Sequence, residues 1–500
     1  MAYSAWVRTE AALALMLGAA ALGASANAAH AERTDLTLGI ALEPPHLDPT
    51  ANAAAAIDEV VYGNVFEGLT RIDESGAVQP GLAESWAISD DGLTYTFKLR
   101  EGVTFHDGTA LDAGDVVFSL DRARGEDSVN AQKGLFEAIE SVDAVDDNSV
   151  AVTLSRLEGS LLYNLGWGDA VIVAPESADG NKERPVGTGP FRFSEWTKGT
   201  EIELVRNDDY WGDAPALERA SFRIVPDPVA ASAALQAGDV QAFPNFPAPE
   251  LVPVFEADPR FTVQVGTTEG ETILAMNNAR PPLDDVRVRR AIAHAVDRQS
   301  IIDGAMFGLG TPIGSHFAPH NGAYIDLTEN SGFDPEKARE LLKEAGVEDL
   351  GLTLKLPPPT YARRGGEIIA GQLRDVGIDV TIEPVEWSTW LDQVFKKKDY
   401  DLTIVSHTEP NDIEIYARDD YYFDYKSEAF DAVMKTLSET ADEAERTRLL
   451  GEAQTILADD AVNAFLFQLA KAGVWDSKLE GLWANSPIQA NDLTGVRWTE

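Results

Sequence analysis

The sequence predicts an α/β protein of two lobes joined by more than one crossing segment. Residues 35–270 have a strand-rich pattern, residues 275–470 alternate strands and helices, and residues 465–498 are strand-like again. A chain that leaves one lobe, builds a second and returns connects the two lobes twice, which makes a hinge. The predicted limits are residues 32–274 for the first lobe, 275–470 for the second and 471–500 for the return segment.

Length and composition agree with a large soluble protein and exclude several classes. The chain has 500 residues, of which 44% are hydrophobic and 25% charged, so disordered, collagen-like and multi-span membrane classes are excluded. With 83 acidic and 40 basic residues the net charge is −43, which repels phosphate backbones and argues against a nucleic-acid partner. Since there is no cysteine, disulfides, thiolate metal sites and a lipid-attachment cysteine are excluded as well.

Residues 1–31 are predicted to be a secretory signal peptide. Arg8 precedes an apolar stretch from Ala11 to Ala26, and small residues then follow in A-x-A order, which places cleavage after Ala28 or Ala31. An N-terminal membrane anchor is the alternative. Because no lipid-attachment cysteine is available, we expect the mature chain to lie free in the periplasm.

The first lobe is predicted from short alternating runs, such as residues 94–99 and 150–154, separated by turn residues. Helices are expected over Ala54–Phe66 and Ala113–Arg124. Asp112 lies at the start of the second helix, where the helix dipole favours an acidic residue.

The second lobe is predicted to contain a parallel sheet covered by helices, because strands and helices alternate along the chain. One helix begins at Asp334-Pro335, with Asp at the N-cap and Pro at the first helical position, and ends before Gly346. Two further helices, lined by Phe430 and by Leu449, follow the sheet. The other predicted elements are a helix over Asp284–Gly304, a strand over Leu352–Leu356, a helix over Gly365–Val376, a strand over Ile378–Val385, a helix over Trp387–Phe395, a strand over Asp401–Val405 and a loop over Ser406–Lys426.

No motif for catalysis or for a resident cofactor is present. The G-x-S-x-G, H-E-x-x-H, Walker A and G-x-G-x-x-G patterns are all missing. His316 and His320 are spaced like metal ligands, but Pro319 between them makes a ligating helix unlikely, so a polar loop is the preferred interpretation. The sequence therefore predicts a protein that is not an enzyme and that has no catalytic residue, metal site or cofactor.

Four blocks of sequence resemble one known family. They read ESWAISDDGLTYTFKLREGVTFHDG from residue 84, PVGTGPFRF from residue 185, RNDDYWG from residue 206 and NNARPPLDDVRVRRAIAHAVDR from residue 277. In content and order these blocks resemble the family 5 extracellular solute-binding proteins of ABC importers, the dipeptide, oligopeptide and nickel class. The resemblance implies a two-lobed periplasmic-binding-protein clamshell of the large class, with an extra subdomain in the first lobe.

The resemblance also implies that a ligand is enclosed between the lobes. One candidate region is Tyr361, Arg363 and Arg364, which follow a strand and begin a helix, a place that suits an anion. Relatives place arginine here or nearby to pair with a ligand carboxylate, and guanidinium pairs such groups in bidentate fashion. The alternative is that these arginines are solvated or paired with Glu367.

A second candidate region follows the last strand of the parallel sheet. In oligopeptide-binding relatives an aspartate near the start of this loop holds the peptide amine, whereas this sequence has Ser406 and His407 there. Acids appear at Glu409 and Asp412, which are the candidate replacements. Trp387, with Trp390, is a candidate stacking wall, the alternative being a core position.

The resemblance therefore predicts a monomeric periplasmic protein that captures a solute, most simply a di- or oligopeptide, and delivers it to the permease subunits of an ABC importer. Because the expected aspartate is missing, an opine, an amino-acid conjugate or an oligosaccharide remains an alternative ligand. A ligand-binding sensor or chaperone is the alternative role.

Overall fold

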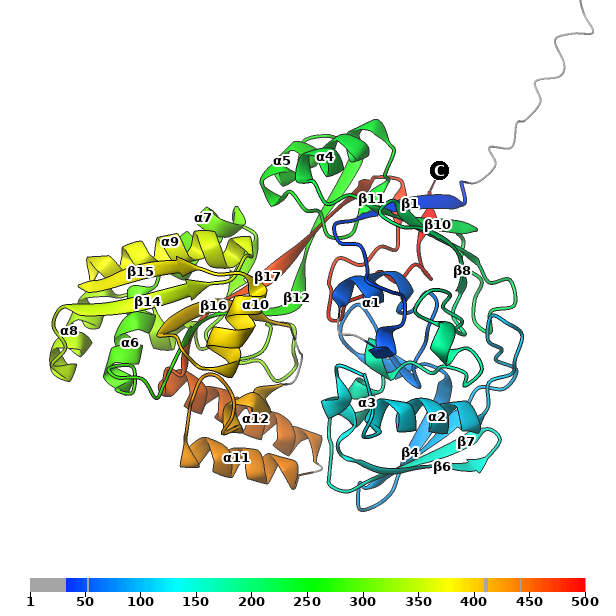
Figure 1. Cartoon of the computed structure of the whole chain (residues 1–500), viewed down its shortest axis with the longest axis horizontal. Helices are drawn as coiled ribbons and strands as arrows, with labels where there is room; N and C mark the ends of the chain where they lie inside the picture. The colour runs from blue at the N-terminus through cyan, green and yellow to red at the C-terminus, as the bar shows by residue number, and fades with distance from the viewer. Residues whose placement is uncertain (1–32, 52–53, 409–411, 441, 500) are drawn as a thin grey trace, which may run out of the picture.

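The computed structural model describes residues 33–51, 54–408, 412–440 and 442–499, and it has two lobes joined by two long strands (Figure 1). Strands β12 (Phe261–Met276) and β17 (Asn463–Asp476) run antiparallel from Phe261 opposite Asp476 to Ala275 opposite Asn463. The predicted limits at residues 275 and 470 fall within these two strands. The predicted clamshell fold is confirmed, and the signal peptide lies outside the described residues.

A parallel sheet forms the centre of the second lobe, as predicted. Strand β14 (Leu350–Leu356) pairs in parallel with β15 (Ile378–Pro384) on one side and β16 (Leu402–His407) on the other, and β16 pairs antiparallel with β12. Helix α9 (Thr360–Asp375) connects β14 to β15 and buries Ile369 and Leu373 in the lobe's main core.

The predicted helix over residues 284–304 is two helices, α6 (Val286–Ala295) and α7 (Arg298–Met306). The backbone is extended at Val296 and Asp297, and the Asp297 side chain accepts hydrogen bonds from the amides of Gln299 and Ser300. Aspartate at an N-cap satisfies amides that a helix start leaves free, so the apolar spacing continues while the helix is interrupted.

Other helices of the second lobe follow the sequence closely. Helix α8 (Pro335–Ala345) is capped by Asp334 and ends at Gly346, which has the left-handed conformation expected of a C-terminal glycine. Helix α9 begins at Thr360, five residues before the predicted Gly365, with Pro359 in the N-cap position and no side-chain capping bond. The remaining elements here are α10 (Trp387–Trp390), the π-helical turn η7 (Leu391–Lys396), α11 (Glu428–Ser438), α12 (Glu443–Asp459), β13 (Gly310–Pro312), and the 3₁₀ turns η6 (Thr328–Ser331) and η8 (Ile413–Ala417).

The first lobe continues the large sheet beyond β17 and adds a second sheet. The continuation runs in the order β11 (Ala242–Phe243), β1 (Asp35–Ile40), β10 (Arg219–Ile224), β9 (Glu201–Arg206) and β8 (Phe191–Thr197). The second sheet is antiparallel and has the order β4 (Ala83–Ile88), β5 (Thr94–Leu99), β7 (Ser149–Leu154) and β6 (Ile139–Asp146). Helix α2 (Ala113–Arg124) packs on that sheet, and Asp112 with Asp115 forms a capping box at its start.

Helix α1 (Ala55–Val61) ends five residues before the predicted Phe66, because Tyr62 is extended and Gly63 has a φ of 69°, which favours glycine. The other elements of this lobe are η1 (Pro49–Ala51), β2 (Thr70–Ile72), β3 (Val78–Pro80), η2 (Lys133–Phe136), α3 (Leu161–Asn164), η3 (Gly168–Ala170), η4 (Ala178–Gly180), α4 (Pro228–Ala237), η5 (Pro249–Leu251), α5 (Val252–Glu256), β18 (Leu479–Glu480) and β19 (Arg497–Trp498).

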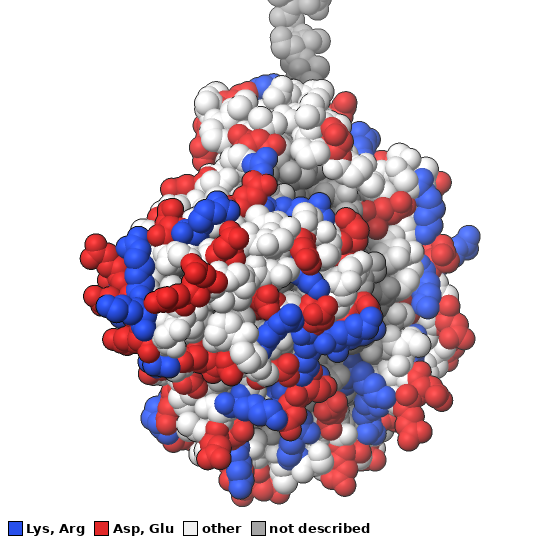
Figure 2. Space-filling view, turned by 60° about the vertical axis from the view of Figure 1, so that its left-hand side comes forward, with Lys and Arg blue, Asp and Glu red and all other residues white. Residues whose placement is uncertain are grey.

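Each lobe has its own hydrophobic core. Leu354 and Ile404 lie in the core around the parallel sheet, whereas Leu38 and Phe97 lie in two cores of the first lobe. Lobes with separate cores can move as units about the strands that join them. On the face turned forward in Figure 2, basic side chains lie among acidic ones. Among the described residues, no helix has the length and apolar character needed to cross a membrane.

Candidate functional site

The carboxyl edge of the parallel sheet brings six of the predicted ligand residues together. Strands β14, β15 and β16 run in the same direction, so the segments that follow them lie at one edge of the sheet. Helix α10, which follows β15, lies on the side of the second lobe that faces the first lobe (Figure 1). Of the six, Tyr361, Arg363, Arg364 and Trp387 lie on the segments that follow β14 and β15, and Ser406 and His407 are the last two residues of β16.

Tyr361 is attached to the end of β16. Its phenol oxygen accepts a hydrogen bond from the Ser406 amide at 3.3 Å, and burial raises the pKa of Tyr361 to about 12, so the phenol keeps its proton. Ser406 pairs with Thr272 of β12, and the hydroxyl oxygens of both residues are buried without a hydrogen-bond partner among the described residues. Buried hydroxyls without a partner are costly, and a ligand or a water can satisfy them.

The two arginines at the start of α9 differ in their partners. Arg363 donates from Nη2 to the Val385 carbonyl at 3.2 Å and to Glu386 Oε1 at 3.3 Å, so its acidic partner is Glu386 and not Glu367. Arg364 is exposed, and its guanidinium carbon lies 5.2 Å from the centre of the Phe307 ring. Arg364 is therefore the arginine more readily available to a ligand carboxylate.

Trp387 and Trp390 have different environments. Trp390 is 4% exposed and donates from its indole nitrogen to Thr403 Oγ1 at 2.9 Å, which makes it a core residue. Trp387 is 40% exposed and packs edge-on against Trp390 with ring centres 5.5 Å apart. Of the predicted stacking wall, Trp387 alone presents a large exposed surface.

His407 lies in an aromatic cluster at the end of β16. Its Nε2 is 3.0 Å from the Tyr422 hydroxyl, and the two rings are stacked with an interplanar angle of 19°. Tyr422 is fully buried, so it fixes the imidazole in place. Glu409, the first acid after His407, lies outside the described residues.

Asp412 is already paired with a histidine. His316 lies between two carboxylates, with Nδ1 2.9 Å from Glu271 Oε2 and Nε2 3.0 Å from Asp412 Oδ1. Although burial alone would lower the pKa of His316, the neighbouring charges of Glu271 and Asp412 raise it to about 10. Asp412 therefore holds a buried cation that belongs to the protein itself.

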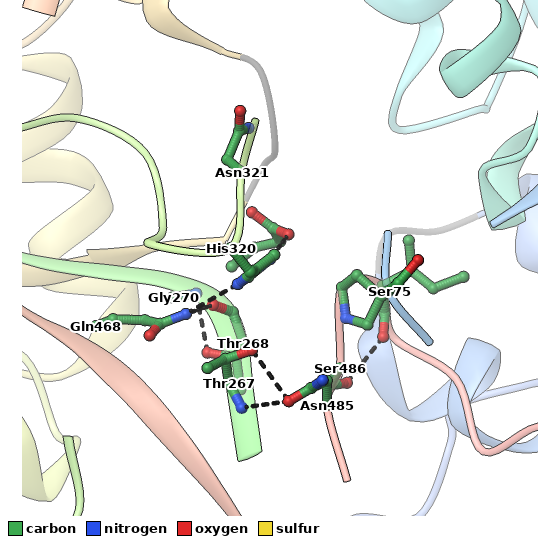
Figure 3. A network of polar contacts seen from close by, with 12 residues as sticks. Ser75, Thr267, Thr268, Gly270, His320, Asn321, Gln468, Asn485 and Ser486 are labelled. Atoms are coloured by element: carbon green, nitrogen blue, oxygen red, sulfur yellow. Dashed lines mark hydrogen bonds and ion pairs between the residues drawn. The ribbon is translucent and has the colours of Figure 1, made fainter. Parts of the chain in front are cut away.

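A polar network joins the crossing strands to both lobes (Figure 3). The Asn485 side-chain oxygen accepts from the Thr267 amide at 3.0 Å and from its hydroxyl at 3.1 Å, and Thr268 forms a strand-like bridge with Ser486. Figure 3 shows His320 of the second lobe to the left of Ser75 of the first lobe, with the bonds between Asn485 and Thr267 below them. The network thus lies where the crossing strand β12 meets the return segment.

The lobes approach each other a second time at α12. A Cβ atom on Gly159 of the first lobe would lie 2.3 Å from the guanidinium of Arg446 on α12. The Glu414 residue has exposed surface, but its carboxyl group is enclosed, and this burial, followed by the charges of Asp412 and of Glu158 in the first lobe, raises its pKa to about 7. A charge of the first lobe therefore acts on a side chain of the second.

Residues 77–425, well over half of the chain, match the bacterial extracellular solute-binding proteins, family 5, in their middle region. The chain belongs to this family. The dipeptide-binding protein of Escherichia coli K12 is 32% identical over 432 residues, which cover 77% of this chain and 79% of the relative.

Solved structures agree with the family 5 assignment. A periplasmic binding protein, DppA, from Helicobacter pylori, in complex with the peptide STSA, superposes with a TM-score of 0.79 at 26% identity, over 94% of this chain and 99% of that one. The oligopeptide-binding protein AppA from Bacillus subtilis, in complex with a nonapeptide, superposes with a TM-score of 0.78 at 26% identity, over 94% and 99% of the two chains.

In this family 5 protein, the contacts of His316 and His320 with the crossing strand β12 could not be predicted from the sequence. His320 Nε2 lies 2.5 Å from Glu269 Oε1, and its Nδ1 lies 3.2 Å from the Gln468 amide nitrogen. Glu269 and Glu271 are two apart on a strand and thus suit a common face, which is a weak signal. Nothing in the sequence connects them to histidines 45 to 51 residues away. No group of three metal-ligating side chains occurs among the described residues.

Two surface pockets lie away from this edge. One has a volume of about 430 Å³ and the other about 330 Å³, and both are in the first lobe. Their walls include none of the predicted ligand residues.

Proposed function

We propose that this protein captures a short peptide between its lobes and delivers it to the permease of an ABC importer. The observation that carries the proposal is the carboxyl edge of the parallel sheet, where exposed Arg364 and Trp387 follow β14 and β15 and Ser406, with its buried unpaired hydroxyl, lies near the end of β16. Arginine suits a peptide carboxylate, and an aromatic face suits an apolar side chain. The names of the relatives, dipeptide- and oligopeptide-binding proteins, support the same ligand class.

The proposal places the protein in the periplasm as a monomer without enzymatic activity. The signal-peptide pattern of residues 1–31 and the extracellular character of the family support this location. The first lobe spans residues 32–274, the second 275–470, and residues 471–500 return to the first. Closure of the two lobes over the peptide excludes water and strengthens its polar contacts.

The environment of the predicted amine anchor supports a second candidate, a solute without a free amine. A buried ammonium needs a carboxylate, but Ser406 and His407 carry none and Asp412 is already paired with His316. A conjugate or an oligosaccharide needs no such anchor.

Binding of Ala-Phe and of N-acetyl-Ala-Phe distinguishes the two candidates. Isothermal titration uses a chain that lacks residues 1–31 and has been unfolded and refolded to release bound solute. For a peptide receptor we expect acetylation to weaken binding at least tenfold, because it removes the charge that a carboxylate would hold. Glu409→Gln should then abolish most of the preference for the free amine. Equal binding of the two compounds would favour the amine-free solute, and absence of binding to any member of a dipeptide library would refute the peptide proposal.

A further inference from the structure

His316 connects three segments that are far apart in the sequence. It lies in the loop between β13 and η6, it contacts Glu271 on the crossing strand β12, and it contacts Asp412 just before η8. The imidazole is 2% exposed, Glu271 7% and Asp412 15%, so the bridge is almost completely dry. Tyr416 packs edge-on against the imidazole with ring centres 5.4 Å apart.

The geometry of this bridge suits a doubly protonated imidazole. Each ring nitrogen lies within 3.0 Å of a carboxylate oxygen, and an imidazolium between two carboxylates makes both contacts attractive. The contact to Asp412 is an ion pair without the alignment of a hydrogen bond, since neither His316 Nε2 nor Asp412 Oδ1 has a hydrogen-bond partner among the described residues. The charged groups that act on the bridge are Glu271 and Asp412 themselves and, beyond them, Glu269 and Glu414. Removal of the imidazolium would leave two carboxylates facing each other in a dry site, which is strongly unfavourable.

The bridge holds residues 412–418 of the second lobe to the crossing strand β12. Glu269 and Glu271 bind His320 and His316, so the loop that carries both histidines is fastened to β12 at two points. His316 alone of the two also reaches Asp412. A second polar tie to the same segment is the bond from Asn463 of β17 to the Tyr416 hydroxyl at 3.2 Å.

We propose that His316 is a positioning residue for solute capture, which fixes residues 412–418 against the crossing strand β12 so that they meet the ligand in one arrangement. The inference rests on the proposed function for its ligand, but the positioning itself can be measured without one. It also assigns Asp412 to the protein's own framework and not to the peptide amine.

The experiment compares two substitutions at the bridge with a matched control. His316→Gln removes the cation, and Asp412→Asn weakens the contact to residues 412–418 while leaving the Glu271 contact in place. The control is His294→Gln. His294 lies on helix α6 and is also buried, at 6% exposure, but its Nδ1 contacts the Gly332 carbonyl oxygen, at 2.8 Å. Hydrogen exchange is followed in the ligand-free proteins, and Ala-Phe affinity is measured at a temperature well below every melting point.

We expect amide exchange in residues 413–418 to be at least tenfold faster in His316→Gln, and faster to a smaller extent in Asp412→Asn. Ala-Phe affinity should fall at least tenfold in His316→Gln, while His294→Gln should change neither the exchange of this segment nor the affinity by more than twofold. If His316→Gln does not fold, Asp412→Asn decides the question.

Unchanged exchange in residues 413–418 of a folded bridge variant would overturn the positioning role. Faster exchange with unchanged Ala-Phe affinity would overturn the role in capture. If the wild-type protein binds no peptide, the proposed function fails, whereas the exchange measurement still decides whether His316 positions the segment.

Discussion

Arg363 and Arg364 are neighbours in the sequence, but they differ in what already binds them. Arg363 donates to Val385 and Glu386, whereas Arg364 lies exposed beside the Phe307 ring. A ligand carboxylate competes with existing partners at Arg363 and not at Arg364. We therefore expect Arg364 to contribute more than Arg363 to the binding of a ligand carboxylate.

We expect Arg364→Ala to weaken Ala-Phe binding by about 2–5 kcal/mol, the range for a lost charged contact inside a closed site. Arg363→Ala should have a smaller effect. Arg374→Ala, at the last turn of the same helix, serves as the control. Titration calorimetry of the three variants measures the differences, and normal binding by both Arg363→Ala and Arg364→Ala would show that neither arginine holds the carboxylate.

At the scale of elements, local signals in the sequence located the helices and strands of the second lobe well. Asp334 with Pro335 and Gly346 define both ends of α8, because capping depends on residues next to each other. The break at Asp297 was missed, since the apolar spacing continues across it. The His316 bridge was missed for a different reason: its partners come from three segments, and no local pattern specifies such a contact.

The return segment packs tightly on the crossing strands, and one glycine allows it. A Cβ on Gly266 of β12 would lie 1.9 Å from the Ala484 carbonyl oxygen. We expect Gly266→Ala to lower the free energy of unfolding by about 1–3 kcal/mol, because a rigid backbone must move to make room. Gly351→Ala in β14, where a Cβ would meet nothing within 4 Å, is the control. Equal urea midpoints for the two variants would show that the backbone of residues 483–486 moves aside at little cost in free energy.

At the scale of the whole molecule, two lobes with separate cores are joined by two strands, an arrangement that allows hinge motion. Away from these strands the lobes also meet where Arg446 lies against Gly159. We expect the radius of gyration to decrease when Ala-Phe is added at saturation, as measured by small-angle X-ray scattering, and no change with N-acetyl-Ala-amide. An unchanged radius with a ligand shown to bind would contradict closure about this hinge.

Buried ionisable groups make stability depend on pH. Burial raises the pKa of Asp169 and of Glu414 to about 7 in the folded protein. Their contribution to the free energy of unfolding is therefore fully present below about pH 4 and is lost as the pH rises through 7. The pKa of His316 is raised to about 10, so its contribution to the free energy of unfolding is also lost as the pH rises above 6.5, the ordinary pKa of histidine. Burial lowers the pKa of His106 to about 4, which destabilises the fold only as the pH falls below 6.5.

These four shifts together predict a higher urea midpoint at pH 6 than at pH 8. Asp169→Asn should reduce the difference, because the amide has no proton to lose, whereas the same change at the exposed Asp90 should leave it unaltered. A higher midpoint at pH 8 than at pH 6 would contradict the prediction.

The antiparallel pairing of β12 with β17 has a consequence for the order of folding. Ala275 lies opposite Asn463, so the chain between them leaves and re-enters the sheet at adjacent positions and can form its own core as soon as it is complete. The first lobe cannot do the same, because Leu36 near its start shares a core with Leu493 and Val496 near the end of the chain. Contacts this distant along the chain form slowly. The lobe that is synthesised first is therefore the one that completes its core last, and the protein stays partly unfolded until its final residues arrive.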